Sequence, residues 1–160
     1  MPIGRIHLLY GLAGSGKTTV ARSLSAGGQG VRFTLDGWML RLYPDLDFES
    51  RAYGVRADEV RDLIWSVAEQ VVLTGSDVVL DWNSWSAGRR RWAVNHAAAL
   101  GAPVILHKLS ANVDTASQQA RERTGRGDRY AHPVTRAGNH HLAALMEEPI
   151  SDEGIEIREH

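Results

Sequence analysis

The segment from Gly11 to Thr18 reads GLAGSGKT, and its residue types and spacing could bind the phosphates of a nucleotide. It satisfies the pattern G-x-x-x-x-G-K-[ST] at every fixed position. The glycines allow backbone angles that turn consecutive N–H groups toward phosphate oxygens. Lys17 would bridge the outer phosphates as a point charge, and the Thr18 hydroxyl is a hard ligand suited to Mg²⁺. We therefore predict that ATP and Mg²⁺ bind here, with the nucleotide held by Gly11, Ala13, Gly14, Ser15, Gly16, Lys17, Thr18 and Thr19.

Two aspartates follow apolar runs that predict buried strands. Asp36 comes directly after residues 31–35, and Asp81 is the last residue of 77–81. Ligands of open α/β sheets bind at the carboxyl ends of the strands. Asp36 could there accept the proton of an acceptor hydroxyl, and Asp81 could hold magnesium beside Thr18. The structural alternative for each aspartate is a cap on the turn that follows.

Aromatic side chains follow the same two strands. Trp38, Trp82 and Trp85 could stack on a base, a sugar or a flat apolar acceptor. Asn83 could orient the acceptor or a water molecule. The alternative for the tryptophans is ordinary burial against loops. These residues are our candidates for the acceptor pocket.

Strands and helices alternate along the chain, and the strands are apolar runs without polar alternation. That pattern predicts a parallel sheet covered by helices on both faces, in three layers. The predicted strands are residues 3–10, 31–35, 77–81, 103–108 and 154–158. The predicted helices are residues 17–25, 58–74, 87–100, 112–124 and 133–146, with residues 43–57 irregular. The apolar face of the second helix is expected to carry Val60, Leu63, Ile64, Val67, Val71 and Val72.

The composition bounds the protein class. A chain of 160 residues fits a single domain over residues 1–160. The formal net charge of −1 gives no global basic field for nucleic acid. The chain has no cysteine, which excludes disulfides, thiolate zinc sites and cysteine nucleophiles. No apolar run reaches the length of a membrane helix, and the N-terminus does not resemble a signal peptide, so we expect a cytoplasmic protein.

With these motifs in place, the chain resembles the small P-loop kinases that group with polynucleotide 5′-kinase, chloramphenicol phosphotransferase, zeta toxin and gluconate kinase. It is most similar to the short bacterial AAA-domain ATP-binding proteins. The resemblance rests on the phosphate loop, on Asp36, on VVLDWNSW at residues 78–85, and on ARERTGRGDRYAHPVT at residues 120–135. The last segment resembles the arginine-bearing lid of these kinases.

The resemblance implies further features. It implies a five-stranded parallel sheet in the order 2-3-1-4-5 and a lid at about residues 120–135. It implies that Asp36 accepts the acceptor proton and that Arg41 contacts substrate or phosphate. The catalytic lid arginines would be Arg123 and Arg126. The chain departs from the family at Gln119, where a first lid arginine is expected, and Arg121 is the alternative.

The function predicted from these observations is transfer of the γ-phosphoryl group of ATP to a hydroxyl of a small molecule, such as a metabolite, nucleoside or antibiotic. One alternative is a polynucleotide 5′-hydroxyl kinase, which would need a basic channel leading to Asp36. The candidates for that channel are Arg41, Arg51, Arg56 and Arg89–Arg91. A second alternative is a nucleotide-binding switch or ATPase without an acceptor. No obligate protein partner is evident, and the sequence alone leaves the acceptor open.

Overall fold

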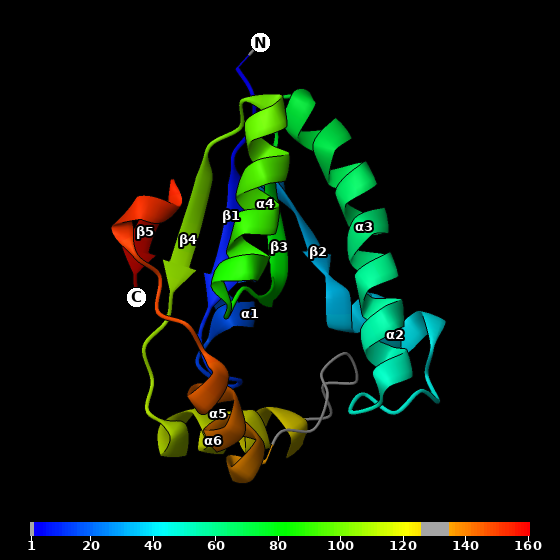
Figure 1. The fold of residues 1–160 in the computed structure, drawn as a ribbon, viewed down its shortest axis with the longest axis vertical. Coiled ribbons are helices and arrows are strands. Elements are labelled where there is room, and N and C mark those ends of the chain that lie inside the picture. Colours follow the sequence, from blue (N-terminus) through cyan, green and yellow to red (C-terminus); the bar gives the residue numbers. More distant parts are fainter. Residues whose placement is uncertain (1, 126–134) are drawn as a thin grey trace.

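The strands form one parallel sheet in the computed structural model, which describes residues 2–125 and 135–160. Within that part of the chain the sheet has five strands in the order β2-β3-β1-β4-β5 (Figure 1). The predicted order 2-3-1-4-5 is therefore confirmed. The strands are β1 (Ile6–Tyr10), β2 (Gly30–Thr34), β3 (Asp77–Asn83), β4 (Val104–Lys108) and β5 (Glu156–Glu159).

Helices cover both faces of the sheet, and α5 and α6 lie across the carboxyl ends of the strands (Figure 1). The helices are α1 (Lys17–Ser25), α2 (Leu35–Leu42), α3 (Arg51–Leu73), α4 (Ala87–Leu100), α5 (Val113–Gly125) and α6 (Arg136–Leu145). Short 3₁₀ turns occupy Ala26–Gly28 and Ser151–Glu153. Among the described residues, no helix combines the length and the apolar character that crossing a bilayer requires.

The central strand β1 is buried along its whole length and packs on both sides. Its alternate residues Ile6, Leu8 and Tyr10 belong to the large core shared with α3 and α4. Leu9 points to the opposite face, where it packs with Val79 of β3 and Ala21 of α1. This period-two alternation holds both helical layers against one rigid sheet.

The second strand begins and ends one residue earlier than predicted, and it leads directly into α2. The strand ends at Thr34, whose side-chain oxygen accepts a hydrogen bond from the backbone N–H of Gly37 at 3.3 Å. This N-cap starts the helix at Leu35. Asp36 therefore lies in the first turn of α2 and does not end the strand.

Helix α3 begins seven residues earlier than predicted, so that prediction was wrong. The Ser50 hydroxyl accepts the backbone N–H of Tyr53 at 3.1 Å and caps the helix, which begins at Arg51. Gly54 weakens the local helical signal. The buried face also differs from the predicted one, because Leu63 and Val67 are exposed. The buried residues of α3 are Ala57, Val60, Ile64, Trp65, Ala68 and Val72.

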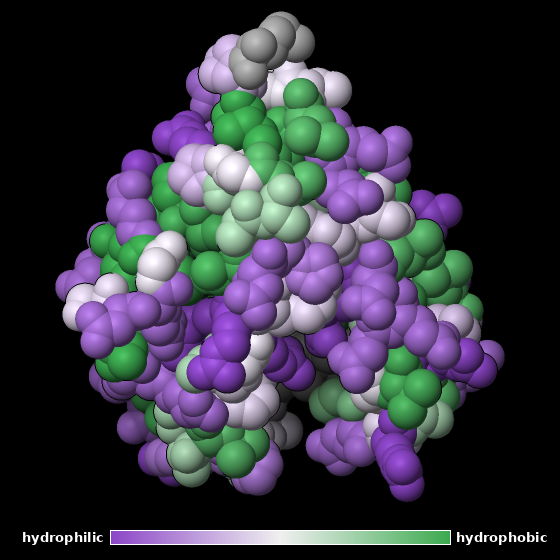
Figure 2. Space-filling model, turned by 45° about the horizontal axis from the view of Figure 1, so that its top comes forward, coloured by the Kyte–Doolittle hydropathy of each residue, from purple (hydrophilic) through white to green (hydrophobic). Residues whose placement is uncertain are grey.

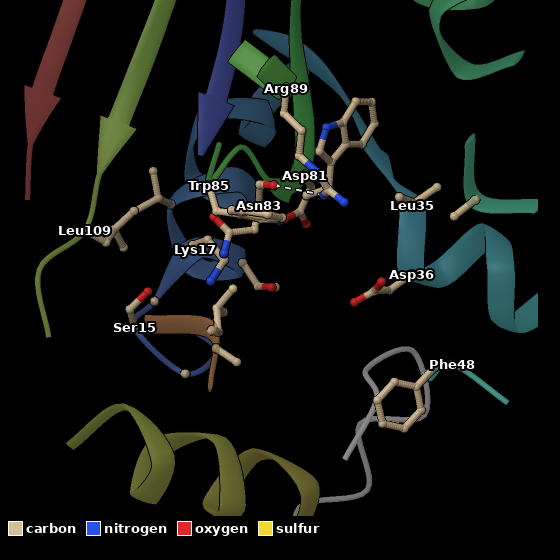
Figure 3. Close-up of a pocket in the computed structure, with 18 of the residues that line it drawn as sticks. Ser15, Lys17, Leu35, Asp36, Phe48, Asp81, Asn83, Trp85, Arg89 and Leu109 are labelled. Atoms are coloured by element: carbon tan, nitrogen blue, oxygen red, sulfur yellow. Dashed lines mark hydrogen bonds between the residues drawn. The ribbon is translucent and has the colours of Figure 1, made fainter. Parts of the chain in front are cut away.

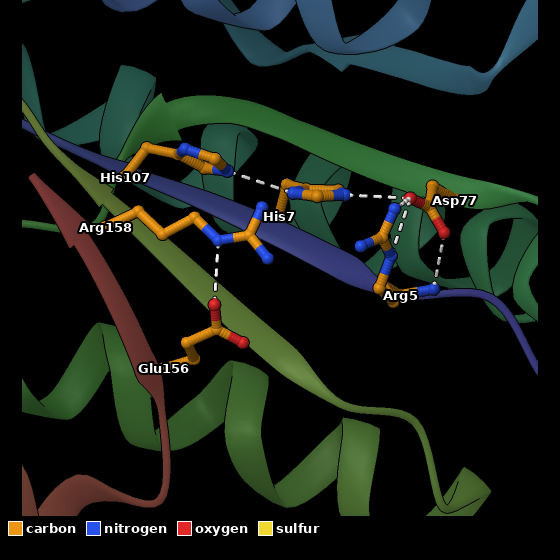
Figure 4. Close-up of polar contacts among 6 residues, drawn as sticks. All are labelled: Arg5, His7, Asp77, His107, Glu156 and Arg158. Carbon is orange, nitrogen blue, oxygen red and sulfur yellow. Dashed lines mark hydrogen bonds and ion pairs between the residues drawn. The ribbon is translucent and has the colours of Figure 1, made fainter. Parts of the chain in front are cut away.

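A chain of histidines crosses the sheet on the α1 side (Figure 4). The Asp77 carboxylate can only accept, so the ring of His7 donates from Nε2 to Asp77 Oδ2 at 3.0 Å. His7 Nδ1 then accepts from His107 Nε2 at 2.9 Å, and His107 Nδ1 accepts from His160 Nε2 at 2.9 Å. Both ring nitrogens of His7 and of His107 are thus paired, and Arg5 completes the network with hydrogen bonds to Asp77.

The pH dependence of the free energy of unfolding should reflect these hydrogen-bonded histidines. Burial lowers the pKa of His7, and burial together with repulsion from His7, His160 and Arg158 lowers the pKa of His107 to about 4. The unfolded chain takes up these protons near its ordinary pKa of 6.5, so the free energy of unfolding should fall as the pH drops from 6.5 toward 4. The slope is up to about 1.4 kcal/mol per pH unit for each histidine.

Urea unfolding at several pH values would measure this slope. In His107→Gln the slope between pH 6.5 and 4 should be smaller than in the wild type. The matched control is His141→Gln, because His141 is exposed on α6. If both variants keep the wild-type slope, the histidine chain does not cause the pH dependence.

Candidate functional site

A large cavity opens at the carboxyl edge of the sheet, at the place where ligands of open α/β sheets bind. Its volume is about 1490 Å³. Pockets for one drug-sized ligand occupy roughly 300–1,000 Å³, so this cavity has room for a nucleotide and a second molecule. Figure 2 shows the surface hollowed at its lower edge, with hydrophilic side chains around the hollow. The phosphate loop lines one side, and Asp36 lies across the open space from Lys17 (Figure 3).

The phosphate loop has the backbone conformation that its glycines predict. Gly14 and Gly16 have φ values of +87° and +102°, a region that favours glycine. Lys17, the first residue of α1, donates from Nζ to the carbonyl oxygens of Gly11 at 2.7 Å and Leu12 at 2.6 Å. The Ser15 hydroxyl is buried and has no hydrogen-bond partner among the described residues. A buried hydroxyl in this position is a ready donor to a phosphate oxygen.

Asparagine side chains hold the backbone of this loop from two directions. Asn83, the last residue of β3, donates to the Gly11 carbonyl at 2.8 Å and accepts the Gly11 N–H at 3.4 Å. Asn139 of α6 does the same for Ala13, at 2.9 and 3.2 Å. Asn139 is 1% exposed and also donates to Ser117 of α5. Sequence reasoning assigned Asn83 to the acceptor and missed Asn139 entirely.

Gly14 also allows α5 to approach the loop closely. A Cβ atom at Gly14 would lie 1.9 Å from the carbonyl oxygen of Ala116. We expect Gly14→Ala to lower the free energy of unfolding by about 1–3 kcal/mol through overpacking. Backbone strain adds about 1–2 kcal/mol. AMPPNP binding should weaken as well, because the loop must shift.

Gly27→Ala is the matched control for this substitution. Gly27 has a φ of +64°, but a Cβ there meets nothing within 4 Å. This variant should show the strain cost alone and keep its AMPPNP affinity. Urea unfolding and AMPPNP titration would measure both effects. Equal losses in the two variants would show that close packing against Ala116 is unimportant.

Asp36 lines the cavity from the first turn of α2. Tyr53 of α3 lines it as well. Burial raises the pKa of Tyr53 to about 12, and the charge of Asp36 adds to the shift. The Asp36 carboxylate therefore lies close enough to Tyr53 to act on it electrostatically. A carboxylate in this position can accept a proton from a hydroxyl bound in the cavity.

Asp81 lines the cavity together with Thr18, as the magnesium prediction requires. It is not at the end of its strand, because β3 continues to Asn83. Its carboxylate forms an ion pair with Arg32 of β2, with Nε at 2.7 Å and Nη2 at 2.5 Å. Both contacts use Oδ2, so this ion pair leaves Oδ1 unused. The Thr18 hydroxyl and Asp81 Oδ1 are oxygen donors of the kind that magnesium prefers, and they fit a magnesium site.

Aromatic and apolar side chains also line the cavity, among them Trp82, Trp85, Leu35 and Phe48. Leu35 and Phe48 lie near Asp36, whereas Trp85 lies beside Asn83 (Figure 3). Among the candidate acceptor residues, Trp38 and Arg41 do not line the cavity. Trp38 packs edge-on against Phe33, with ring centres 6.2 Å apart, and Arg41 is exposed on α2.

The lid prediction is resolved only in part. Gln119 and Glu122 of α5 line the cavity, whereas Arg121 is exposed and does not line it. The side chain of Arg123 and the whole of Arg126 lie outside the described residues. The structure thus places the Gln119 face of α5 on the cavity, and the catalytic roles of Arg123 and Arg126 stay predictions.

Three cavity-lining arginines come from other elements. Arg22 lies on α1, Arg61 lies on α3, and Arg89 lies in the first turn of α4. The sequence indicated Arg89 as one of three consecutive arginines of which one could face the site, and it gave no indication of Arg61. The spacing of Arg61 to Tyr53 and Ala57 on one helix face would have been a usable signal, had α3 been predicted to begin at Arg51.

Comparison with known proteins gives one family match and several structural ones. The profile of an AAA domain family matches residues 6–149. No match is found among curated proteins.

Three solved structures have the same fold. A candidate kinase from Chloroflexus aurantiacus has a TM-score of 0.73 at 16% identity, covering 98% of this chain and 88% of that one. Kti12 from Chaetomium thermophilum, solved with ADP-AlF3, has a TM-score of 0.68 at 20% identity, covering 96% and 88%. The APS kinase CysC of Mycobacterium tuberculosis, solved with AMPPNP and APS, has a TM-score of 0.64 at 22% identity, covering 99% and 90%.

Proposed function

The chain belongs to this AAA domain family of P-loop proteins, and from that membership we propose that it transfers the γ-phosphoryl group of ATP to a hydroxyl of a small molecule. One observation carries the proposal: the phosphate loop and Asp36 lie on opposite sides of the same cavity. A cavity of about 1490 Å³ has room for ATP and an acceptor together. The fold shared with an APS kinase supports the same reading.

The residues divide the reaction between them. The N–H groups of the loop, Ser15 and Lys17 bind and orient the phosphates, and Lys17 neutralises charge that develops on the transferred group. Asp36 accepts the proton of the attacking hydroxyl. Phosphoryl transfer depends mainly on positioning and charge stabilisation, so an ordinary carboxylate is a sufficient base.

Magnesium and the lid complete the proposal. Thr18 and Asp81 would hold Mg²⁺, which neutralises phosphate charge when bound. A lid arginine, Arg123 or Arg126, would stabilise the transferring phosphoryl group from the α5 side. Gln119 and Glu122 line the cavity on that side.

The polynucleotide alternative has less support, because two of the six arginines named for its channel form ion pairs with glutamates. Arg90 is 1% exposed and forms a two-pronged ion pair with Glu153, at 2.7 and 2.9 Å. Arg56 pairs with Glu59 at 2.9 Å. These contacts remove both side chains from a continuous basic track, so we place a small acceptor first.

Phosphoryl transfer from γ-labelled ATP tests the proposal. The labelled ATP is incubated with Mg²⁺ and either a panel of hydroxylated small molecules or a short 5′-hydroxyl oligonucleotide. Label on a small molecule is the expected result, and label on the oligonucleotide would establish the polynucleotide alternative. ATP hydrolysis that no acceptor changes would instead indicate an ATPase or switch.

A further inference from the structure

Arg61 and Arg89 form a pair of guanidinium groups on the cavity wall, and each is braced by a tryptophan. The Arg61 guanidinium carbon lies 5.9 Å from the ring centre of Trp82. The corresponding distance from Arg89 to Trp85 is 5.2 Å. Stacking of this kind fixes the orientation of a guanidinium before any ligand arrives.

Arg89 has little compensation for its charge. In the described part of the chain, no carboxylate lies within ion-pair distance of it. Its side-chain hydrogen bond, from Nη1 to the Asn83 carbonyl, is long at 3.4 Å. Burial and the nearby positive charge of Arg61 lower the pKa of Arg89. A partly buried cation without an ion-pair partner is costly, and an anion in the cavity would lower that cost.

Arg61 is satisfied only in part. Its Nη1 pairs with Asp58 at 2.5 Å, but that carboxylate is 76% exposed to solvent. Its Nε is buried and has no hydrogen-bond partner among the described residues. The charge of Arg61 is therefore only partly compensated, by one solvent-exposed carboxylate.

Among the described residues, two other arginines are not exposed, and both have carboxylate partners, which makes this pair distinctive. Arg90 follows Arg89 directly, yet it binds Glu153 through two nitrogens and also donates to the Ser84 carbonyl at 3.0 Å. Arg32 binds Asp81 through two nitrogens. Of these four arginines, the two with incomplete partners, Arg61 and Arg89, both line the cavity.

Arg61 lies toward the Asp36 side of the cavity, and Arg89 lies beside Asp81 and Asn83 at the carboxyl end of β3 (Figure 3). Arg61 shares α3 with Tyr53, and the pKa of Tyr53 responds to the charges of both Asp36 and Arg61. The phosphate loop, by contrast, supplies Lys17 and Ser15 for the nucleotide. Arg61 is thus on the Asp36 side, where the hydroxyl of an acceptor would lie.

We propose that the acceptor carries an anionic group, a phosphate or a carboxylate, that binds to Arg61 and Arg89 while its hydroxyl faces Asp36. This inference rests on the proposed kinase function and narrows its substrate class. Guanidinium groups bind both anions through paired charge-assisted hydrogen bonds. This interaction would also position the hydroxyl, because the arginines would hold the substrate at its anionic group while Asp36 contacts its hydroxyl.

Anion binding can be measured without knowing the acceptor. Indole N–H signals are recorded by NMR in ¹⁵N-labelled protein saturated with AMPPNP and Mg²⁺, so that the phosphate loop is blocked. Inorganic phosphate, then acetate, is titrated in, with sodium chloride as the ionic-strength control. Trp82→Phe and Trp85→Phe assign the two signals. We expect phosphate or acetate to shift both indole signals. The anion that binds with the higher affinity identifies the anionic group of the acceptor.

Variants locate the binding site. Arg61→Gln and Arg89→Gln should each weaken anion binding about tenfold or more, which is the loss of one charge-assisted contact. Arg89→Lys should retain part of the affinity for the anion, because lysine keeps the positive charge but cannot form the bidentate hydrogen bonds of a guanidinium. Arg91→Gln is the matched control, since Arg91 is exposed on the same helix, and it should bind as the wild type does.

The contrary outcomes are distinct. A wild type that binds AMPPNP but shows no response to either anion overturns this inference and leaves the kinase proposal standing. Unchanged anion affinity in both glutamine variants also overturns it. If the variants lose AMPPNP affinity instead, the arginines serve the nucleotide and the inference is wrong. A wild type that fails to bind AMPPNP overturns the kinase proposal itself.

Discussion

Replacing Lys17 by alanine should reduce phosphoryl transfer by about 10²–10³-fold or more, because the cation that faces the transferring phosphoryl group is lost. Affinity for AMPPNP should also fall, by about tenfold, since Lys17 binds phosphate in the ground state as well. In the structure the ammonium is already held over the loop by the carbonyls of Gly11 and Leu12. Transfer from γ-labelled ATP and AMPPNP titration would measure the two losses separately.

The chain offers a matched control, because its only other lysine is Lys108. Lys108 lies at the end of β4 and pairs with Glu148 at 2.8 Å. Lys108→Ala removes an equal charge outside the cavity and should leave transfer unchanged. If Lys17→Ala folds and keeps both its AMPPNP affinity and its transfer rate, the loop does not bind nucleotide in the way proposed.

The phosphate loop could be located from sequence because each of its positions is dictated by local chemistry. A positive φ at Gly14 and Gly16, a cation at Lys17 and a hydroxyl at Thr18 are all requirements within eight consecutive residues. The central strands could also be predicted from their apolar runs, because these strands are buried on both faces. The sheet order came from the family resemblance, and the strand pairing confirms it.

The acceptor side was harder to predict, because it depends on where α2 begins. The Thr34 cap starts the helix at Leu35, so Leu35 and Asp36 line the cavity. Trp38 and Arg41 lie about 200° and 140° around the helix from Asp36, since each residue turns by about 100°. The sequence predicted no helix at residues 35–42, and an irregular segment would have allowed all of these side chains to face one ligand.

The missed residues act through partners that are distant in sequence. Asn139 holds Ala13, which is 126 residues away, and no local pattern announces that contact. Arg61 lines the cavity because the face of α3 that carries Tyr53 and Ala57 lies beside the carboxyl end of β3. Such residues are defined by packing of the complete fold, so they become visible only in three dimensions.

Replacing Asp36 by asparagine should reduce phosphoryl transfer by about 10²–10⁴-fold, the usual contribution of a positioned general base. The amide has nearly the same shape as the carboxylate, but it cannot accept the proton of the attacking hydroxyl. Asp36 lies across the cavity from Lys17 (Figure 3), so the affinity for AMPPNP should stay within about twofold of the wild type. Single-turnover transfer and AMPPNP titration separate the two quantities.

Asp62→Asn is the matched control, because Asp62 is exposed on α3 and does not line the cavity. It changes the net charge equally and should leave transfer intact. If Asp36→Asn transfers phosphate at the wild-type rate, Asp36 is a first-turn residue of α2 with a structural role. If the variant loses AMPPNP affinity instead, Asp36 belongs to the nucleotide site. Lost transfer with retained AMPPNP binding is the one result that places a proton acceptor opposite the phosphate loop, as a kinase acting on a hydroxyl requires.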